Sequence, residues 1–225
     1  MGFLRKAWAI AWKDIVSELR TRETIFSMFL FGFLVVLIFN FGIEPGIRDE
    51  NLVKPGVLWA AFTFAGILGL NRSFAAEKDN DCLQGLLLCP VDRAVVYLGK
   101  FIGNFAFVFS MGVIVSLFFS VLYNVDVLQA AAPLGLILLL ATVGFCAVGT
   151  LFSALSVGLR GRDVILAILL FPVMVPVVLA AAKSTGGILD GRGLSGAGGW
   201  LWLLVVYDVI FLAISIMTFD YVVED

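Results

Sequence analysis

Six long apolar runs restrict this chain to one class of fold. Each is about 20 residues long, the length at which an α-helix crosses the hydrocarbon core of a bilayer. The runs are Phe26–Ile43, Val57–Phe74, Phe101–Tyr123, Ala131–Leu155, Val164–Ala182 and Trp200–Phe219. Backbone groups in lipid must find hydrogen bonds within the protein, so such runs form helices. The sequence therefore predicts an all-α membrane protein with six transmembrane helices in one domain, residues 1–225.

Lysine and arginine fall unequally on the two sides of the predicted bundle. With a cytoplasmic N-terminus, the outer segments hold four of the 15 basic residues: Arg48, Lys54, Lys183 and Arg192. The inner segments hold the other eleven: Arg5, Lys6, Lys13, Arg20, Arg22, Arg72, Lys78, Arg93, Lys100, Arg160 and Arg162. Cytoplasmic loops carry such an excess. We therefore expect both termini in the cytoplasm, together with the segment between the second and third spans.

Residues 1–24 form a predicted amphipathic helix ahead of the first span. Its large apolar side chains share one narrow arc at 100° per residue: Leu4, Trp8, Trp12, Ile15 and Leu19. Lys6, Lys13 and Arg20 lie on the opposite side. Basic and tryptophan-bearing faces together are typical of a helix in the headgroup layer. Packing against the bundle is the alternative, and the two are compatible.

Residues 77–90, between the second and third spans, predict a short cytoplasmic docking helix. Asp81 and Gln84 form a capping-box pattern, and Pro90 ends the helix. Acids at its start disfavour contact with an anionic leaflet, so we expect it to bind a partner protein. The residues expected to make or position this contact are Glu77, Asp81, Leu83, Gln84, Leu86, Leu87 and Pro90. Asp92 can cap the helix that follows.

Two further features have both a functional and a plain structural interpretation, and a third has a structural one only. Arg160, Arg162 and Asp163 form an inner turn that makes either a second cytoplasmic contact or a charge anchor for the spans. Asp208 lies in the middle of the sixth span, where a charged carboxylate is costly. It is either a polar, proton-linked site or a neutral carboxyl hydrogen-bonded to a neighbouring helix, which we favour. The glycine-rich residues 186–199 predict a flexible outer loop.

Several function classes lack the residues that they need. The chain has no histidine, and its three cysteines have no metal-site spacing. No Gly-rich phosphate loop ending in Lys-Ser/Thr occurs, so ATP hydrolysis requires a separate subunit. A net charge of −2 gives no reason to expect nucleic acid. We expect no enzyme activity, no metal and no bound cofactor. For haem, Trp59, Trp200 and Trp202 offer flat apolar contact at most, and the haem-binding residues are unknown.

Several stretches resemble one transporter family. They are IEPGIRDENLVKPGVLWAAFTFAGILGLNRSFAAEKDND (43–81), LQGLLLCPVDRAVVYLGK (83–100) and SVGLRGRDVILAILLFPVMVPVVLAAA (156–182). The chain as a whole resembles ABC-type export permeases, and these stretches are similar to the CcmB family, the permease subunit of the haem exporter of cytochrome c maturation. The family usually has Asp-Gly before the docking helix and an acid within it. Asn80-Asp81 and Gln84 stand there in this chain.

The resemblance implies a function and a set of partners. It implies a permease subunit in a bacterial inner membrane, acting in haem export or delivery for c-type cytochromes, with haem as the handled substrate. It implies a CcmA-like ATPase that uses ATP, a second copy of this chain, a CcmC-like haem-handling protein, a small CcmD-like subunit and a CcmE-like carrier. Residues 77–90 would then transmit force from the ATPase to the spans.

Two alternatives stay open on the sequence alone. One is an ABC-type exporter permease for lipid or polysaccharide, although PGVLW and VGLRGRD argue against it. The other is a non-transporting membrane scaffold of a haem-handling complex. A membrane enzyme is disfavoured, because the chain has no histidine and only one acid in the middle of a span, so no catalytic pair can be assembled.

Overall fold

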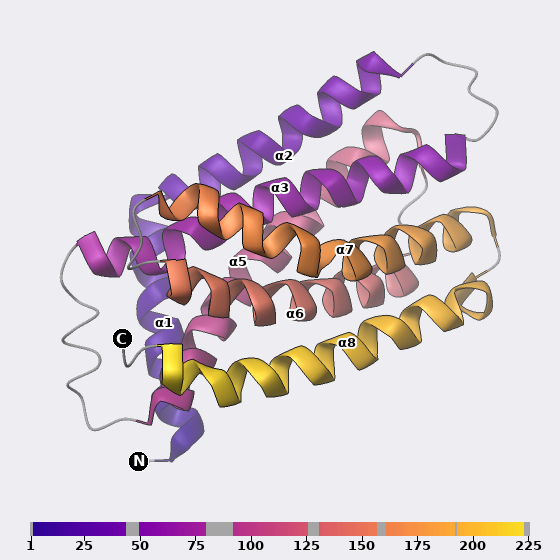
Figure 1. Ribbon diagram of the computed structural model, residues 1–225. Coiled ribbons are helices and arrows are strands. Elements are labelled where there is room, and N and C mark those ends of the chain that lie inside the picture. Colours follow the sequence, from indigo (N-terminus) through magenta and orange to yellow (C-terminus); the bar gives the residue numbers. More distant parts are fainter. Residues whose placement is uncertain are drawn as a thin grey trace.

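A computed structural model describes residues 2–43, 50–79, 92–125, 131–156, 161–191 and 193–222. Within these ranges every regular element is an α-helix (Figure 1). The helices are α1 (Phe3–Thr21), α2 (Glu23–Gly42), α3 (Glu50–Asp79), α5 (Arg93–Leu122), α6 (Ala131–Ser156), α7 (Arg162–Leu189) and α8 (Gly193–Val222). Six of them, α2 to α8, contain stretches long and apolar enough to cross a membrane. The predicted all-α class with six spans is confirmed.

The six spans run side by side and alternate in direction, while α1 runs across them (Figure 1). Helix α3 ends, α5 begins and α8 ends at the end of the bundle where α1 lies. We call this the α1 end. The predicted segment 77–90 joins α3 to α5, and both of those helix ends lie there.

Helix α6 is the centre of the bundle. About two thirds of its span is buried, a larger share than in any other span. It packs against α5, α7 and α8, and also contacts α3. Phe145 of α6 occupies the space where a side chain at Gly66 of α3 would lie, since a Cβ atom there would come within 2.6 Å of the ring. Small residues at such crossings let helices in a membrane approach closely.

The prediction of a flexible loop over residues 186–199 is wrong. Helix α7 continues to Leu189 and α8 already begins at Gly193, so the connection is short. Gly191 and Gly193 have φ values of 77° and 60°, a backbone conformation that favours glycine. The other glycines stay helical because helix is the form that satisfies backbone groups inside a membrane protein, whatever the weak helix propensity of glycine in water.

Candidate functional site

The first residues of α5 are the point where the predicted docking segment enters the membrane domain. Asp92 is the N-cap of α5, and its carboxylate accepts a hydrogen bond from the backbone N–H of Ala94 at 3.2 Å. A carboxylate at this position also favours the helix through the dipole. The predicted cap is confirmed. The chain thus passes from residues 77–90 into a capped helix after a single residue, Val91.

Four polar side chains extend from this part of α5 at spacings of four, three and four residues. We call Arg93, Tyr97, Lys100 and Asn104 the polar stripe of α5. The Arg93 guanidinium donates to the backbone oxygen of Asp220 on α8 at 2.8 Å. The Tyr97 hydroxyl donates to the carbonyl of Ala147 on α6 at 2.9 Å. The stripe therefore ties the base of α5 to two neighbouring helices.

Lys100 and Asn104 complete these ties. The Asn104 amide donates to the Thr150 hydroxyl on α6 at 2.9 Å. The Lys100 ammonium lies 2.9 Å from a carboxylate oxygen of Asp14 on α1, and the Lys100 side chain is 1% exposed. A buried ammonium needs such a partner, because desolvating a lone charge costs several kcal/mol. The pair fixes α1 against α5.

The side chains around this pair are small, so the backbones of α1 and α5 come close. Ala7 and Ala11 are the buried residues of α1. Opposite them on α5, a Cβ atom at Gly99 would lie 2.7 Å from the Ile10 side chain and 2.9 Å from the Ala7 carbonyl. Close approach of this kind leaves room for nothing larger than glycine at position 99.

Glu18 holds the C-terminal end of α1 against α2. Its carboxylate accepts hydrogen bonds from the backbone N–H groups of Thr24 at 2.7 Å and Ile25 at 3.2 Å, and from the Thr24 hydroxyl at 2.9 Å. These N–H groups belong to the first turn of α2, where backbone N–H groups have no acceptor within the helix. Helix α1 is therefore held both to α2 and to α5.

The predicted amphipathic character of α1 is present in the structure. In addition to the predicted apolar face and basic face, α1 has a third face of alanines. The alanine face is buried, whereas the large apolar side chains are not. Leu4, Trp8, Trp12 and Leu19 are each more than half exposed, and Ile15 is half-buried. Helix α1 runs across the spans (Figure 1), so this apolar face is placed as an interfacial helix requires.

The predicted docking residues fall mostly outside the described ranges. Asp81, Leu83, Gln84, Leu86, Leu87, Pro90 and Arg160 lie outside them. Glu77 is in the last turn of α3, so α3 continues past the predicted end of its span at Phe74. Arg162 and Asp163 open α7 after Gly161, whose φ is 78°. The docking role of all these residues stays a prediction.

Asp208 lies where its position in the sixth span predicts, in α8 and 7% exposed. A Cβ atom added at Gly144 of α6 would lie 2.5 Å from its Oδ1, so the carboxyl faces α6. Within the described part of the chain, neither carboxyl oxygen has a hydrogen-bond partner. The expected hydrogen bond to a neighbouring helix is therefore absent from the described structure. A neutral carboxyl stays the prediction, because no compensating group is described and an unpaired charge there is costly.

We expect Asp208→Asn to change the free energy of unfolding by less than about 1 kcal/mol, because the amide keeps the shape and neutrality of the protonated carboxyl. Asp208→Lys, which adds a charge at the same place, should cost about 3 kcal/mol. Unfolding of the detergent-solubilised protein measures both. A loss with asparagine as large as that with lysine would mean that the carboxyl is needed in its charged form.

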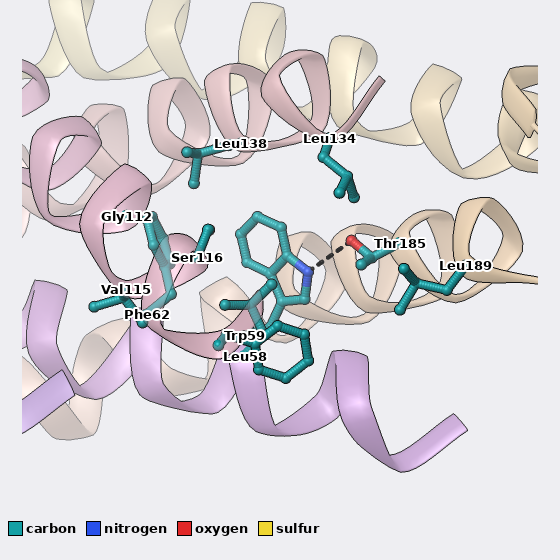
Figure 2. Close-up of a pocket in the computed structure, with 11 residues that line it drawn as sticks. Leu58, Trp59, Phe62, Gly112, Val115, Ser116, Leu134, Leu138, Thr185 and Leu189 are labelled. Atoms are coloured by element: carbon teal, nitrogen blue, oxygen red, sulfur yellow. Dashed lines mark hydrogen bonds between the residues drawn. The ribbon is translucent and has the colours of Figure 1, made fainter. Parts of the chain in front are cut away.

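An apolar pocket lies between α3, α5, α6 and α7 (Figure 2). It is lined by the first halves of α3 and α6 and the second halves of α5 and α7, which lie at the end of the bundle away from α1 (Figure 1). Its cavity volume is only about 30 Å³, room for no more than a few molecules the size of water. Its lining comprises Leu58, Trp59, Phe62, Gly112, Val115, Ser116, Phe119, Leu134, Leu138, Thr185 and Leu189. None of these side chains is charged. The Trp59 indole donates to the Thr185 hydroxyl at 3.0 Å, so both polar groups are satisfied.

The chemistry of this pocket suits an uncharged, apolar group. A haem carries two carboxylates and an iron, and the lining offers neither a cation nor an iron ligand among the described residues. Trp59 is fixed in this wall, whereas Trp200 and Trp202 of α8 are 41% and 68% exposed. The three tryptophans proposed for flat apolar contact therefore do not form one site.

Sequence reasoning missed the contacts that hold the base of α5. Asp14 received no role from the sequence, and Lys100 counted only as an inner basic residue. One usable signal existed, because Asp14 and Glu18 are spaced i, i+4 with Ala7 and Ala11 on the same face of α1. Acids beside alanines on the narrow face predict contact with polar groups of a neighbouring helix, although the partner is not predictable.

Comparison with known proteins gives a consistent result over nearly the whole chain. The family described as CcmB protein matches residues 5–224. Heme exporter protein B of Pseudomonas aeruginosa is 26% identical over 174 residues, covering 77% of each chain. The protein of the same name from Haemophilus influenzae is 26% identical over 193 residues, covering 85% of each. That of Escherichia coli K12 is 27% identical over 178 residues, covering 79% of this chain and 80% of the relative.

Proposed function

This chain belongs to the CcmB protein family and is the membrane permease subunit of a haem-export ABC system in c-type cytochrome biogenesis, and from that premise we propose that a separate ATPase drives it through residues 77–90. As a transporter component it works together with other haem-exporter subunits. The finer proposal concerns how force enters the membrane domain and which subunit supplies it.

The observation that carries the proposal is the construction of the α5 base. Residues 77–90 lead directly into a capped helix whose polar stripe contacts α1, α6 and α8. Movement of this segment would therefore displace α5 together with α1, and α1 would carry the first turn of α2 through Glu18. The other end of the segment is the last turn of α3. A force applied to residues 77–90 from the cytoplasm would thus act on α2, α3 and α5 together.

The partners and the orientation follow from the same proposal. We place both termini and residues 77–90 in the cytoplasm and the chain in a bacterial inner membrane. A CcmA-like ATPase dimer would bind two copies of this chain, with Arg160, Arg162 and Asp163 as a second contact. A CcmC-like protein, with a CcmD-like subunit and a CcmE-like carrier, would handle the haem. Haem is cargo in this scheme, and this chain holds no cofactor of its own.

Co-purification from mild detergent tests the assembly. We expect an ABC ATPase and a haem-handling membrane protein to travel with the chain, and we would identify them by mass spectrometry. An ATPase accompanied by enzymes of lipid or glycan synthesis would contradict the cargo. Haem-handling proteins without any ATPase would contradict the coupling and favour a scaffold.

A further inference from the structure

Two prolines interrupt the backbone hydrogen bonding of α7 near its middle. Pro172 and Pro176 lie within the helix, and both are exposed. A proline has no backbone N–H, so the carbonyls of Ile168 and Pro172 lack the donor that follows four residues later in an unbroken helix. Residues 164–182 contain no serine or threonine whose hydroxyl could replace these bonds. We call residues 168–176 the proline stretch, and its own backbone supports it only weakly.

The parts of α7 before and after the proline stretch are held in different ways. After it, the hydroxyl of the buried Thr185 accepts the hydrogen bond of the Trp59 indole on α3 at 3.0 Å. Before it, Leu166 and Leu170 pack into the apolar core, while Val164 stays exposed. Apolar contacts are not directional, whereas a hydrogen bond fixes the two groups that it joins. The first part of α7 can therefore shift about the proline stretch while the second part stays on α3.

Tyr207 of α8 braces the proline stretch from outside. Its hydroxyl donates to the carbonyl of Val173 at 3.0 Å and lies 3.7 Å from the sulfur of Met174, and both acceptors stand between the two prolines. The ring of Tyr207 is itself held in place. A Cβ atom at Gly144 of α6 would lie 3.0 Å from it, and it stacks on Phe211 with the ring centroids 4.2 Å apart. One side chain of α8 thus fits a notch in α6 and supports α7.

We propose that α7 bends at the proline stretch and that Tyr207 is the positioning residue that limits this bend. A proline-interrupted helix in a membrane needs support of this kind from a neighbouring helix. Helix α7 begins with Arg162 and Asp163, the second contact of the proposed coupling, so a force applied there would be taken up at the proline stretch. The source of that force rests on the proposed function. The bend and its brace depend on this chain alone.

The test measures distances between pairs of spin labels on the full chain in detergent, with the native cysteines replaced by alanine. One pair joins Val164 at the start of α7 to Leu155 at the end of α6, and the control pair joins Leu179 of α7 to Leu136 of α6. All four positions are exposed. Tyr207→Phe keeps the ring and removes only the hydroxyl. We expect it to raise the population of displaced distances in the first pair about five-fold, the factor that corresponds to one hydrogen bond, and to leave the control pair unchanged.

Replacing both prolines supplies the matched rescue. Pro172→Ala/Pro176→Ala restores the missing N–H donors and should narrow the distances of the first pair. Adding Tyr207→Phe to this variant should then have no effect, because a continuous helix needs no brace. Equal broadening of both label pairs by Tyr207→Phe would overturn the proposal, since Tyr207 would then be a general packing residue, and so would a first pair that none of the variants changes. Because no ATPase is present, these distances decide the bend separately from the coupling, which co-purification decides.

Discussion

Replacing Asp14 by leucine should destabilise the protein by about 3 kcal/mol, the lower part of the range for breaking a buried ion pair. The reason is the position of Lys100, whose side chain is 1% exposed and loses the carboxylate that lies 2.9 Å from its ammonium. The opposite change, Lys100→Met, should cost less. Asp14 is 18% exposed and also lies 3.2 Å from Lys13, so it keeps a cation.

The double variant Asp14→Leu/Lys100→Met separates charge from packing. It leaves no buried charge behind, and apolar replacement of a buried pair is often neutral or stabilising. We therefore expect it to recover most of the stability that Asp14→Leu loses. Unfolding in mild detergent, followed by tryptophan fluorescence, measures all three proteins. A double variant no more stable than Asp14→Leu would mean that the ion pair is not what holds α1.

Gly99→Leu should push α1 off α5. Already a Cβ atom at this position would lie 2.9 Å from the backbone oxygen of Ala7, and a helix backbone cannot move aside as a side-chain end can. Overpacking of this kind costs about 1–3 kcal/mol. Because Lys100 is the next residue, the shift should also weaken its pair with Asp14.

Hydrogen exchange of the α1 amides reports this displacement locally. We expect exchange in Phe3–Thr21 to accelerate about ten-fold or more, as for a helix that has lost more than about 1.4 kcal/mol of local stability. Gly135→Leu on α6 is the control, since a Cβ atom there meets nothing within 4 Å. Unchanged α1 protection in Gly99→Leu would show that the two helices can separate without loss.

The spans and the interfacial helix were predictable because each depends on local sequence. Hydropathy alone places a span such as Ala131–Leu155, and the structure has the helix Ala131–Ser156 there. Helical periodicity predicted the apolar face of α1. The position of Asp92 just before an apolar run predicted the N-cap of α5. In each case the residues that decide the structure are close together in the chain.

The contacts that join helices were not predictable in the same way. Asp14 and Lys100 come from different helices, and periodicity gives the face of a helix but not the residue that meets it. The glycine-rich stretch 186–199 misled for a different reason. Propensities measured in water predict a loop, whereas in a membrane protein helix is the form that satisfies the backbone. Asp208 was predicted as a neutral carboxyl hydrogen-bonded to a neighbouring helix, and its lack of a partner in the described chain depends on packing that the sequence does not specify.

The most direct test of coupling is a pair of matched variants in the proposed docking segment. In a strain that lacks this chain, Leu83→Asp/Leu87→Asp should insert normally, lose the co-purifying ATPase and fail to restore c-type cytochromes. Gln84→Glu places one acid in the same segment, where the family usually has one, and should keep both. Full restoration of c-type cytochromes by Leu83→Asp/Leu87→Asp without an attached ATPase would contradict the account.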